Sequence, residues 1–128
     1  MNTERFILVV DDDADFREIV QAKLNACGFK TDSACDGIEA VEKAKKNQPS
    51  LIVMDIEMPR EDGVSATIDL AKDPLTMNIP VVFLTNLSNE AINEIRRKFV
   101  DMPGPKAYFR KQDNYDVLMR SIGALVAA

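Results

Sequence analysis

The chain of 128 residues contains no histidine and no tryptophan, and it has only two cysteines. Without histidine it has no imidazole of its own for acid–base chemistry or for a Cys/His zinc site. Cys27 and Cys35 form neither a CxxC pair nor a zinc pattern, so we expect reduced thiols in a cytoplasmic protein, with a disulfide as the minor alternative. No apolar run is long enough to cross a bilayer and no signal peptide is evident, so we expect no membrane partner.

Basic charge is also scarce. The chain has 16 Lys and Arg residues and 21 Asp and Glu residues, which gives a net charge of −5. A phosphate backbone requires clustered basic groups, so we expect no direct nucleic-acid partner. Arg96, Arg97 and Lys98 form one basic cluster, which a solvated helix face explains adequately. The length and the 46% hydrophobic content predict a single globular domain over residues 1–128.

The chain does contain four short apolar runs, each followed by a residue able to bind metal or phosphate. Residues 7–10 precede Asp11 and Asp12, residues 51–54 precede Asp55, residues 81–84 precede Thr85, and residues 107–110 precede Lys111. Such runs, with helical patterns between them, indicate buried strands of a parallel sheet. The carboxyl ends of parallel strands meet at one edge, where ligands bind, so we expect these five side chains to converge.

The segments between the runs have helical spacing. Asp13 or Asp15 is expected to cap a first helix that ends at Gly28, and its apolar residues are Phe16, Ile19, Val20, Leu24 and Cys27. Asp36 and Glu39 have the spacing of a capping box for the second helix. Residues 29–34 form a more polar strand suited to a sheet edge. The pattern predicts five βα units, an α/β fold with helices on both faces of the sheet.

The acidic side chains at the strand ends favour a metal site. Two carboxylates about 4 Å apart repel by roughly 4 kcal/mol at an effective dielectric near 20. Asp11, Asp12 and Asp55 therefore need a cation or a proton, and oxygen ligands without His or Cys favour Mg²⁺. Asp55 is the best nucleophile, because it alone ends the central third strand and carboxylates form acyl phosphates. Each residue alone has a simpler explanation, such as a helix cap for Asp13; the joint pattern carries the argument.

That joint pattern resembles the receiver domain of two-component response regulators. The matching stretches are residues 9–12, residues 54–59 with Asp62 and Gly63, residues 84–85, and residues 108–111. The resemblance implies a flavodoxin-like three-layer (βα)5 sandwich with a parallel sheet of order 2-1-3-4-5. It also implies that Asp55 accepts a phosphoryl group from the phosphohistidine of a histidine kinase or histidine phosphotransfer protein. The missing histidine is consistent with this, since the donor histidine belongs to the partner.

The resemblance also implies roles for the neighbouring residues. Asp12 and Asp55 would bind Mg²⁺ directly, Asp11 mainly through water, and Glu57 through its backbone carbonyl. Such a protein is not a conventional enzyme, but Mg²⁺-dependent self-phosphorylation from a phosphodonor and self-dephosphorylation are expected.

On the opposite side of the acceptor, Lys111 would pair with the phosphoryl oxygens, and the Thr85 hydroxyl would follow them on activation. Tyr108 matches the switch aromatic that moves inward behind the threonine. The output surface would comprise the fourth helix, fifth strand and fifth helix, where a homodimer partner or downstream protein binds. The last helix has an apolar stripe of Tyr115, Leu118, Met119, Ile122 and Leu125, with Val117, Ala124 and Val126 partly outside it. Ordinary packing explains that excess equally well.

Three departures from the family pattern affect these expectations. Asn86 stands where a small residue is usual, so access to the phosphoryl site is expected to be narrower. Gln112 replaces a proline that follows a cis bond. Because a cis bond before a non-proline residue costs about 2.5–4 kcal/mol, we expect a trans bond and a rebuilt loop around Lys111. Residues 102–105 form an atypical Pro- and Gly-rich connector that is expected to stiffen the output face.

Three other functions are compatible with parts of this pattern. A haloacid-dehalogenase-type phosphatase would use Asp11 and Asp13 as its DxD motif with Thr85 and Lys111, but it lacks a later acidic pair and leaves Asp55 unexplained. A flavodoxin-type carrier would place a flavin phosphate against acidic residues. A receiver-like interaction module that is not phosphorylated remains open, because Asn86 and Gln112 depart from the family.

Overall fold

The structure, a computed structural model, describes residues 6–58 and 61–127, in which five strands alternate with five helices. The strands are β1 (Phe6–Val10), β2 (Lys30–Ala34), β3 (Leu51–Met54), β4 (Val81–Thr85) and β5 (Lys106–Arg110). The helices are α1 (Ala14–Ala26), α2 (Gly37–Asn47), α3 (Gly63–Ala71), α4 (Asn89–Phe99) and α5 (Tyr115–Ala127). All the predicted strands and helices are present, with ends close to those predicted.

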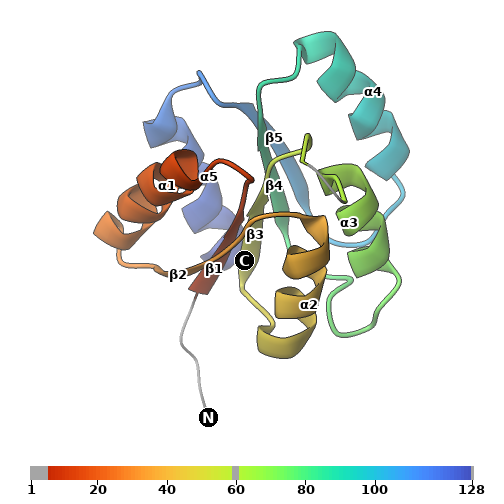
Figure 1. The fold of residues 1–128 in the computed structure, drawn as a ribbon. Coiled ribbons are helices and arrows are strands. Elements are labelled where there is room, and N and C mark those ends of the chain that lie inside the picture. Colours follow the sequence, from red (N-terminus) through yellow and green to blue (C-terminus); the bar gives the residue numbers. More distant parts are fainter. Residues whose placement is uncertain (1–5, 59–60, 128) are drawn as a thin grey trace.

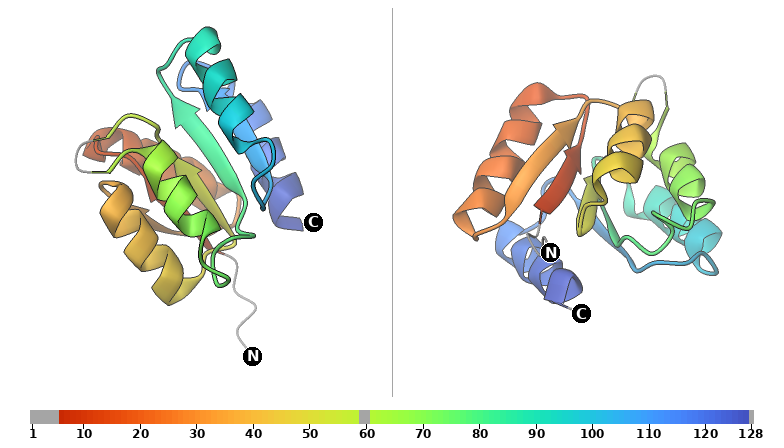
Figure 2. Two further views of the ribbon diagram at one scale, coloured as in Figure 1. Left: turned by 90° about the vertical axis from the view of Figure 1, so that its right-hand side faces the viewer. Right: turned by 90° about the horizontal axis from the view of Figure 1, so that it is seen from below.

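The strands form one parallel sheet in the order β2-β1-β3-β4-β5, as the resemblance implied. Helices α1 and α5 cover one face of the sheet and α2, α3 and α4 cover the other, which gives three layers (Figures 1 and 2). The register pairs Val10 with Met54, so the residues that follow β1 and β3 emerge side by side at one edge. None of the helices described here has the length and apolar character needed to cross a membrane.

Each face of the sheet has its own hydrophobic core, because successive strand residues point to opposite faces. In β1, Ile7 and Val9 pack toward α1 and α5, whereas Leu8 and Val10 pack toward α2, α3 and α4. The central strands β1, β3 and β4 consist of apolar residues apart from Thr85 at the end of β4, which is typical of a parallel sheet covered on both sides.

The buried stripe of α1 is narrower than the sequence indicated. Val20 and Leu24 are fully buried, but Ile19 is 51% exposed and Cys27 is also exposed, so the expectation that these two belong to the apolar face is wrong. Ile19 precedes Val20 by one residue, which turns it about 100° around the helix axis and away from the sheet. Cys27 and Cys35 are both exposed, and neither forms a disulfide in the structure.

The helix termini follow the sequence closely. Asp13, not Asp15, caps α1, since its carboxylate accepts from two backbone N–H groups of the first turn. Asp36 caps α2 by accepting from the Glu39 N–H at 2.9 Å. The Glu39 carboxylate accepts in return from the Cys35 N–H at 2.7 Å, one residue earlier than in a standard capping box. Gly28 follows α1 with a φ of +93°, a conformation that favours glycine.

The connector before β5 is tied down at two points. The Lys106 ammonium donates to the carbonyl oxygens of Pro103 and Gly104 at 2.8 and 2.9 Å. Gly104 has a φ of +85° and packs against the backbone of residues 77–79. Pro59, the last residue of the stretch 54–59 that matches the receiver pattern, lies outside the described residues, as does Arg60.

Candidate functional site

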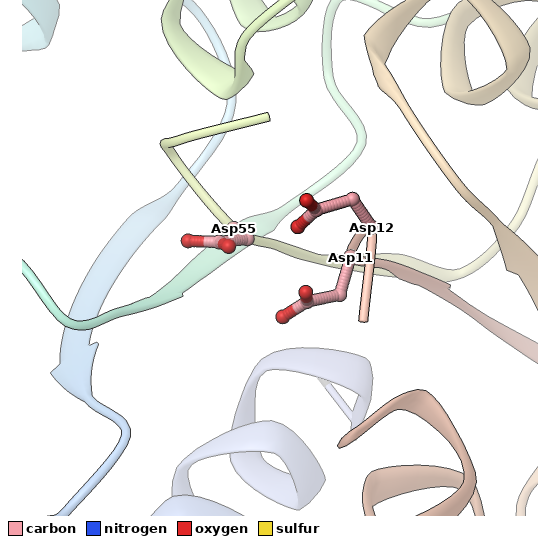
Figure 3. A group of neighbouring side chains, drawn as sticks. All are labelled: Asp11, Asp12 and Asp55. Carbon is pink, nitrogen blue, oxygen red and sulfur yellow. The ribbon is translucent and has the colours of Figure 1, made fainter. Parts of the chain in front are cut away.

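Three carboxylates meet at the carboxyl edge of the sheet. Asp11 and Asp12 follow β1 and Asp55 follows β3, and Figure 3 shows the three side chains gathered at these strand ends. One oxygen from each lies within 4.8 Å of the other two. Asp11 and Asp55 are buried, with 2% and 6% of their surface exposed, whereas Asp12 is exposed. The predicted convergence of these residues is therefore present, with two acids inside and one at the mouth.

Lys111 reaches the same point from the end of β5. Its Nζ lies 2.8 Å from Asp11 Oδ2 and 3.4 Å from Asp55 Oδ2. Burial alone would lower the pKa of Lys111, but the contacts with Asp11 and Asp55 outweigh it and raise the pKa above its usual value. Lys111 is therefore a permanent cation of this site.

One ammonium does not neutralise the site. Burial raises the pKa of Asp55, the charge of Asp11 raises it further, and Lys111 and Thr85 only partly counteract them. The ionised Asp55 is thus held in a place where it is disfavoured, which a further cation would relieve.

The donor set fits Mg²⁺. It consists of hard carboxylate oxygens on two adjacent strand ends, and Mg²⁺ is usually bound by a few carboxylates together with waters. The open pocket around them has a volume of about 360 Å³. Its lining residues are Asp11, Asp12, Asp13, Asp55, Glu57, Asn86 and Lys111. Glu57 and Asn86 therefore border the site as expected.

Thr85 lies on β4, the strand beside the acceptor strand β3, and Tyr108 lies on β5, one strand further away. Thr85 is fully buried at the end of β4, and its backbone carbonyl accepts from the Lys111 N–H at 2.9 Å. Tyr108 in β5 is half-buried and stacks on Phe83, with ring centroids 5.3 Å apart. Arg96, Arg97 and Lys98 are exposed on α4, as expected of a solvated helix face. The Arg96 guanidinium also lies 4.4 Å from the Tyr108 centroid, a cation–π contact that the sequence did not indicate.

The loop after β5 contains a trans bond where the family pattern has a cis bond. No cis peptide bond occurs in the described part of the chain, so the bond between Lys111 and Gln112 is trans, as predicted. Asp113 closes the loop onto Arg110 twice, by accepting from its N–H and by donating to its carbonyl, both at 2.9 Å. These bonds hold the backbone that carries Lys111.

Two further residues of the site were not identified from the sequence. Lys111 Nζ lies 4.3 Å from the centroid of the Phe16 ring, and Arg17 Nη1 donates to the Asp11 carbonyl at 2.6 Å. The sequence placed Phe16 in the apolar stripe of α1. The only sequence feature that could have indicated a role for Phe16 is its position about one helical turn after Asp11 and Asp12. That feature is not specific, because residues without any such role often occupy the same position.

The lack of a side chain at Gly63 lets the start of α3 approach the backbone of Asp55 closely. A Cβ on Gly63 would overlap the backbone carbonyl of Asp55, and the Gly63 N–H donates to the Ile56 carbonyl at 2.8 Å. Asp62 then caps α3 by accepting from the Ser65 N–H at 2.8 Å. The Asp62-Gly63 pair therefore sets the path of the segment that follows the acceptor.

Comparisons with known proteins identify the family and agree with the fold. The model of the response regulator receiver domain family matches residues 7–121. The "DNA-binding dual master transcriptional regulator RpaA" of Synechocystis is 31% identical over 121 residues, which cover 94% of this chain and 48% of that protein. The chain spans between a third and a half of the length of such curated relatives. The name of this relative weakens the expectation that the protein has no nucleic-acid partner.

Solved structures give the same picture. The receiver domain of the Francisella response regulator 1452 superposes with a TM-score of 0.83 at 30% identity, over 97% of this chain and 98% of that one. Thermotoga maritima TrrA, solved in complex with Mg²⁺ and BeF, superposes with a TM-score of 0.80 at 27% identity, over 94% of this chain and 98% of that one. These matches support neither a phosphatase nor a flavin carrier, and Asp13, which the phosphatase would need, serves as the cap of α1.

Proposed function

Because the chain belongs to the response regulator receiver domain family of two-component systems, we propose that it is a phosphorylation-activated switch whose acceptor is Asp55. The donor is a phosphohistidine of a histidine kinase or histidine phosphotransfer protein. The observation that carries the proposal is the meeting of three carboxylates and the Lys111 ammonium in one open pocket. We also propose that residues 1–128 form one receiver domain and that it works in the cytoplasm.

The transfer is a displacement at phosphorus. An Asp55 oxygen forms a bond to phosphorus, the bond between phosphorus and the donor imidazole nitrogen breaks, and the electron pair stays on that nitrogen. The product is an acyl phosphate on Asp55. Lys111 already lies 3.4 Å from an Asp55 oxygen, so its ammonium is in position to pair with the phosphoryl oxygens.

Asp11, Asp12, Asp55 and the Glu57 carbonyl would hold Mg²⁺, which when bound offsets the negative charge of the phosphoryl group. The reverse reaction is hydrolysis. A water oxygen bonds to phosphorus, the bond to the Asp55 oxygen breaks, and inorganic phosphate leaves with the water protons. The open pocket gives water access to this bond.

Phosphorylation of Asp55 would change the conformation of Thr85 and Tyr108, which would transmit it to the output surface. The Thr85 hydroxyl would turn to the phosphoryl group, and Tyr108 would move inward and leave Arg96. The output surface would be formed by α4, β5 and α5, and would bind a second copy or a downstream protein. Support comes from exposed apolar residues there, with Val117 at 44% and Val100 at 75% exposure, and from an adjoining groove of about 250 Å³.

The direct test is the intact mass of the protein after incubation with acetyl phosphate and Mg²⁺. We expect the wild type to gain one phosphoryl group, and Asp55→Asn or protein treated with a chelator to gain none. Phosphorylation of Asp55→Asn to the same extent would overturn the assignment. An interaction module that is not phosphorylated would instead bind its partner equally well with Asp55→Asn.

The phosphatase alternative is separated by a second assay. Turnover of a generic phosphate ester that is abolished by Asp11→Asn but retained by Asp55→Asn would favour that enzyme. The switch proposed here predicts no such turnover.

A further inference from the structure

The first turn of α1 places an aromatic ring against the Lys111 ammonium. Phe16 is half-buried, and its ring centroid lies 4.3 Å from Lys111 Nζ. The same nitrogen contacts Asp11 and Asp55 at 2.8 and 3.4 Å. The ammonium therefore lies between an aromatic face and two carboxylates, and a ring face attracts a cation through its quadrupole.

The other restraints on Lys111 act on its backbone. Its N–H donates to the Thr85 carbonyl at 2.9 Å, and the Asp113–Arg110 bonds close the following loop. Neither restrains the four-carbon stem, which loses considerable rotamer freedom when the ammonium is fixed. The end of the side chain is thus positioned by what it touches, which is two acids and one ring.

Of these three contacts, the ring alone is not itself a ligand for the metal or the acceptor of the phosphoryl group. A cation bound by the acids would compete with Lys111 for Asp11, and a phosphoryl group would replace the free Asp55 oxygen. Tyr115 also lies near Lys111, but its ring is engaged by the Lys23 ammonium, 5.4 Å from the centroid.

We propose that Phe16 is a positioning residue for phosphoryl transfer, whose ring keeps the Lys111 ammonium directed at Asp55 while the acids bind their ligands. The inference rests on the proposed function, because Lys111 has this task only if Asp55 is phosphorylated. It differs from a packing role, since an aliphatic side chain of similar size would fill the same space without attracting the ammonium.

The test uses two substitutions of Phe16 and one control. Phe16→Leu removes the ring, Phe16→Tyr keeps it, and Val20→Ala weakens the same helix and the same core at a fully buried position one turn away. The first measurement is the proton chemical shift of the Lys111 ε-methylene in the unliganded protein. The ring should move it upfield in the wild type, Phe16→Tyr and Val20→Ala, and the shift should disappear in Phe16→Leu.

The second measurement compares the affinities for beryllofluoride, as a phosphoryl analogue, and for Mg²⁺ alone. Phe16→Leu should weaken beryllofluoride binding by roughly 3-fold to 30-fold, the range of a cation–π contact. Its Mg²⁺ affinity should be unchanged or higher, because a loosened ammonium competes less for Asp11. Phe16→Tyr should bind both ligands as the wild type does, and so should Val20→Ala.

The inference is overturned if Phe16→Leu binds beryllofluoride as the wild type does, or if Phe16→Leu and Val20→Ala weaken both ligands alike. Failure of the proposed function looks different: the wild type itself would not bind beryllofluoride. The chemical shift would then still decide whether the ring holds the ammonium.

Discussion

Replacing Lys111 by methionine should destabilise the protein in the absence of divalent cations and strengthen its binding of Mg²⁺. Methionine keeps most of the apolar stem and removes the charge. The lost contacts lie at 2.8 Å to Asp11 and 3.4 Å to Asp55, and the Lys111 side chain is 14% exposed. At an effective dielectric near 20, each contact corresponds to about 5–6 kcal/mol of attraction, most of it offset by desolvation.

The net cost follows from the acids that remain. Removing one partner of a buried ion pair costs about 3–5 kcal/mol, because the other partner stays buried and unpaired. Lys111 is partly exposed and the remaining acids can take up a proton, so we expect the free energy of unfolding to fall by about 3 kcal/mol. Added Mg²⁺ should restore most of this loss, since it stabilises the native state by about 2.7 kcal/mol at 100 times its Kd.

The assay is urea unfolding in a chelator and then at increasing Mg²⁺, with Lys106→Met as the matched control. Lys106 is also a partly buried ammonium of β5, but it donates to the carbonyls of Pro103 and Gly104. Its loss should destabilise the protein in chelator, and Mg²⁺ should stabilise this variant only as much as it stabilises the wild type. The reasoning is refuted if Lys111→Met is as stable as the wild type in chelator, or if it binds Mg²⁺ more weakly.

Three further predictions concern single side chains. Burial and the charge of Asp11 raise the pKa of Asp55, so the folded state favours its protonated form. Without metal, the free energy of unfolding should therefore fall as the pH rises through that pKa. Asp55→Asn should remove this pH dependence and add about 1 kcal/mol to the free energy of unfolding at neutral pH in chelator, measured by urea unfolding. A hydrogen bond with Asp69, then burial, raise the pKa of Glu61 from 4.5 to about 7, so thermal stability should decline between these pH values in the wild type but not in Glu61→Gln. Asn86 is exposed at the rim of the pocket, so Asn86→Ala should be phosphorylated faster by acetyl phosphate in a mass-based time course.

Each of these has a plain contrary outcome. Asp55→Asn with an unchanged pH profile would mean that the acceptor is not held in a disfavoured ionised form. A Glu61→Gln profile parallel to the wild type would place the titration elsewhere, and an Asn86→Ala variant that reacts no faster would remove the argument for restricted access.

The fold and the convergence of the acids were predictable because they depend on local patterns and one general rule. Apolar runs define the strands, and capping residues such as Asp36 define helix starts. Parallel strands then bring their carboxyl ends to one edge, and the pairing of Val10 with Met54 places Asp11 beside Asp55. None of these steps requires the details of side-chain packing.

The contacts that hold the functional groups were not predictable in this way. The contacts of Phe16 with Lys111 and of Arg96 with Tyr108 join a helix to a distant strand, so no spacing in the sequence signals them. The exposure of Ile19 has a related cause. Periodicity shows that α1 has an apolar side, but the roll of the helix on the sheet decides which residue at the edge of that side is covered.

The environment of Tyr108 gives this chain an optical reporter of its own. The chain has no tryptophan and two tyrosines, so its ultraviolet emission arises from Tyr108 and Tyr115. Tyr108 is enclosed between the Phe83 ring and the Arg96 guanidinium, and its fluorescence depends on whether that charged group stays against it. A Tyr115→Phe protein would therefore carry a single unlabelled fluorophore at the centre of the α4–β5 surface, and rearrangement there could be followed in solution by light alone.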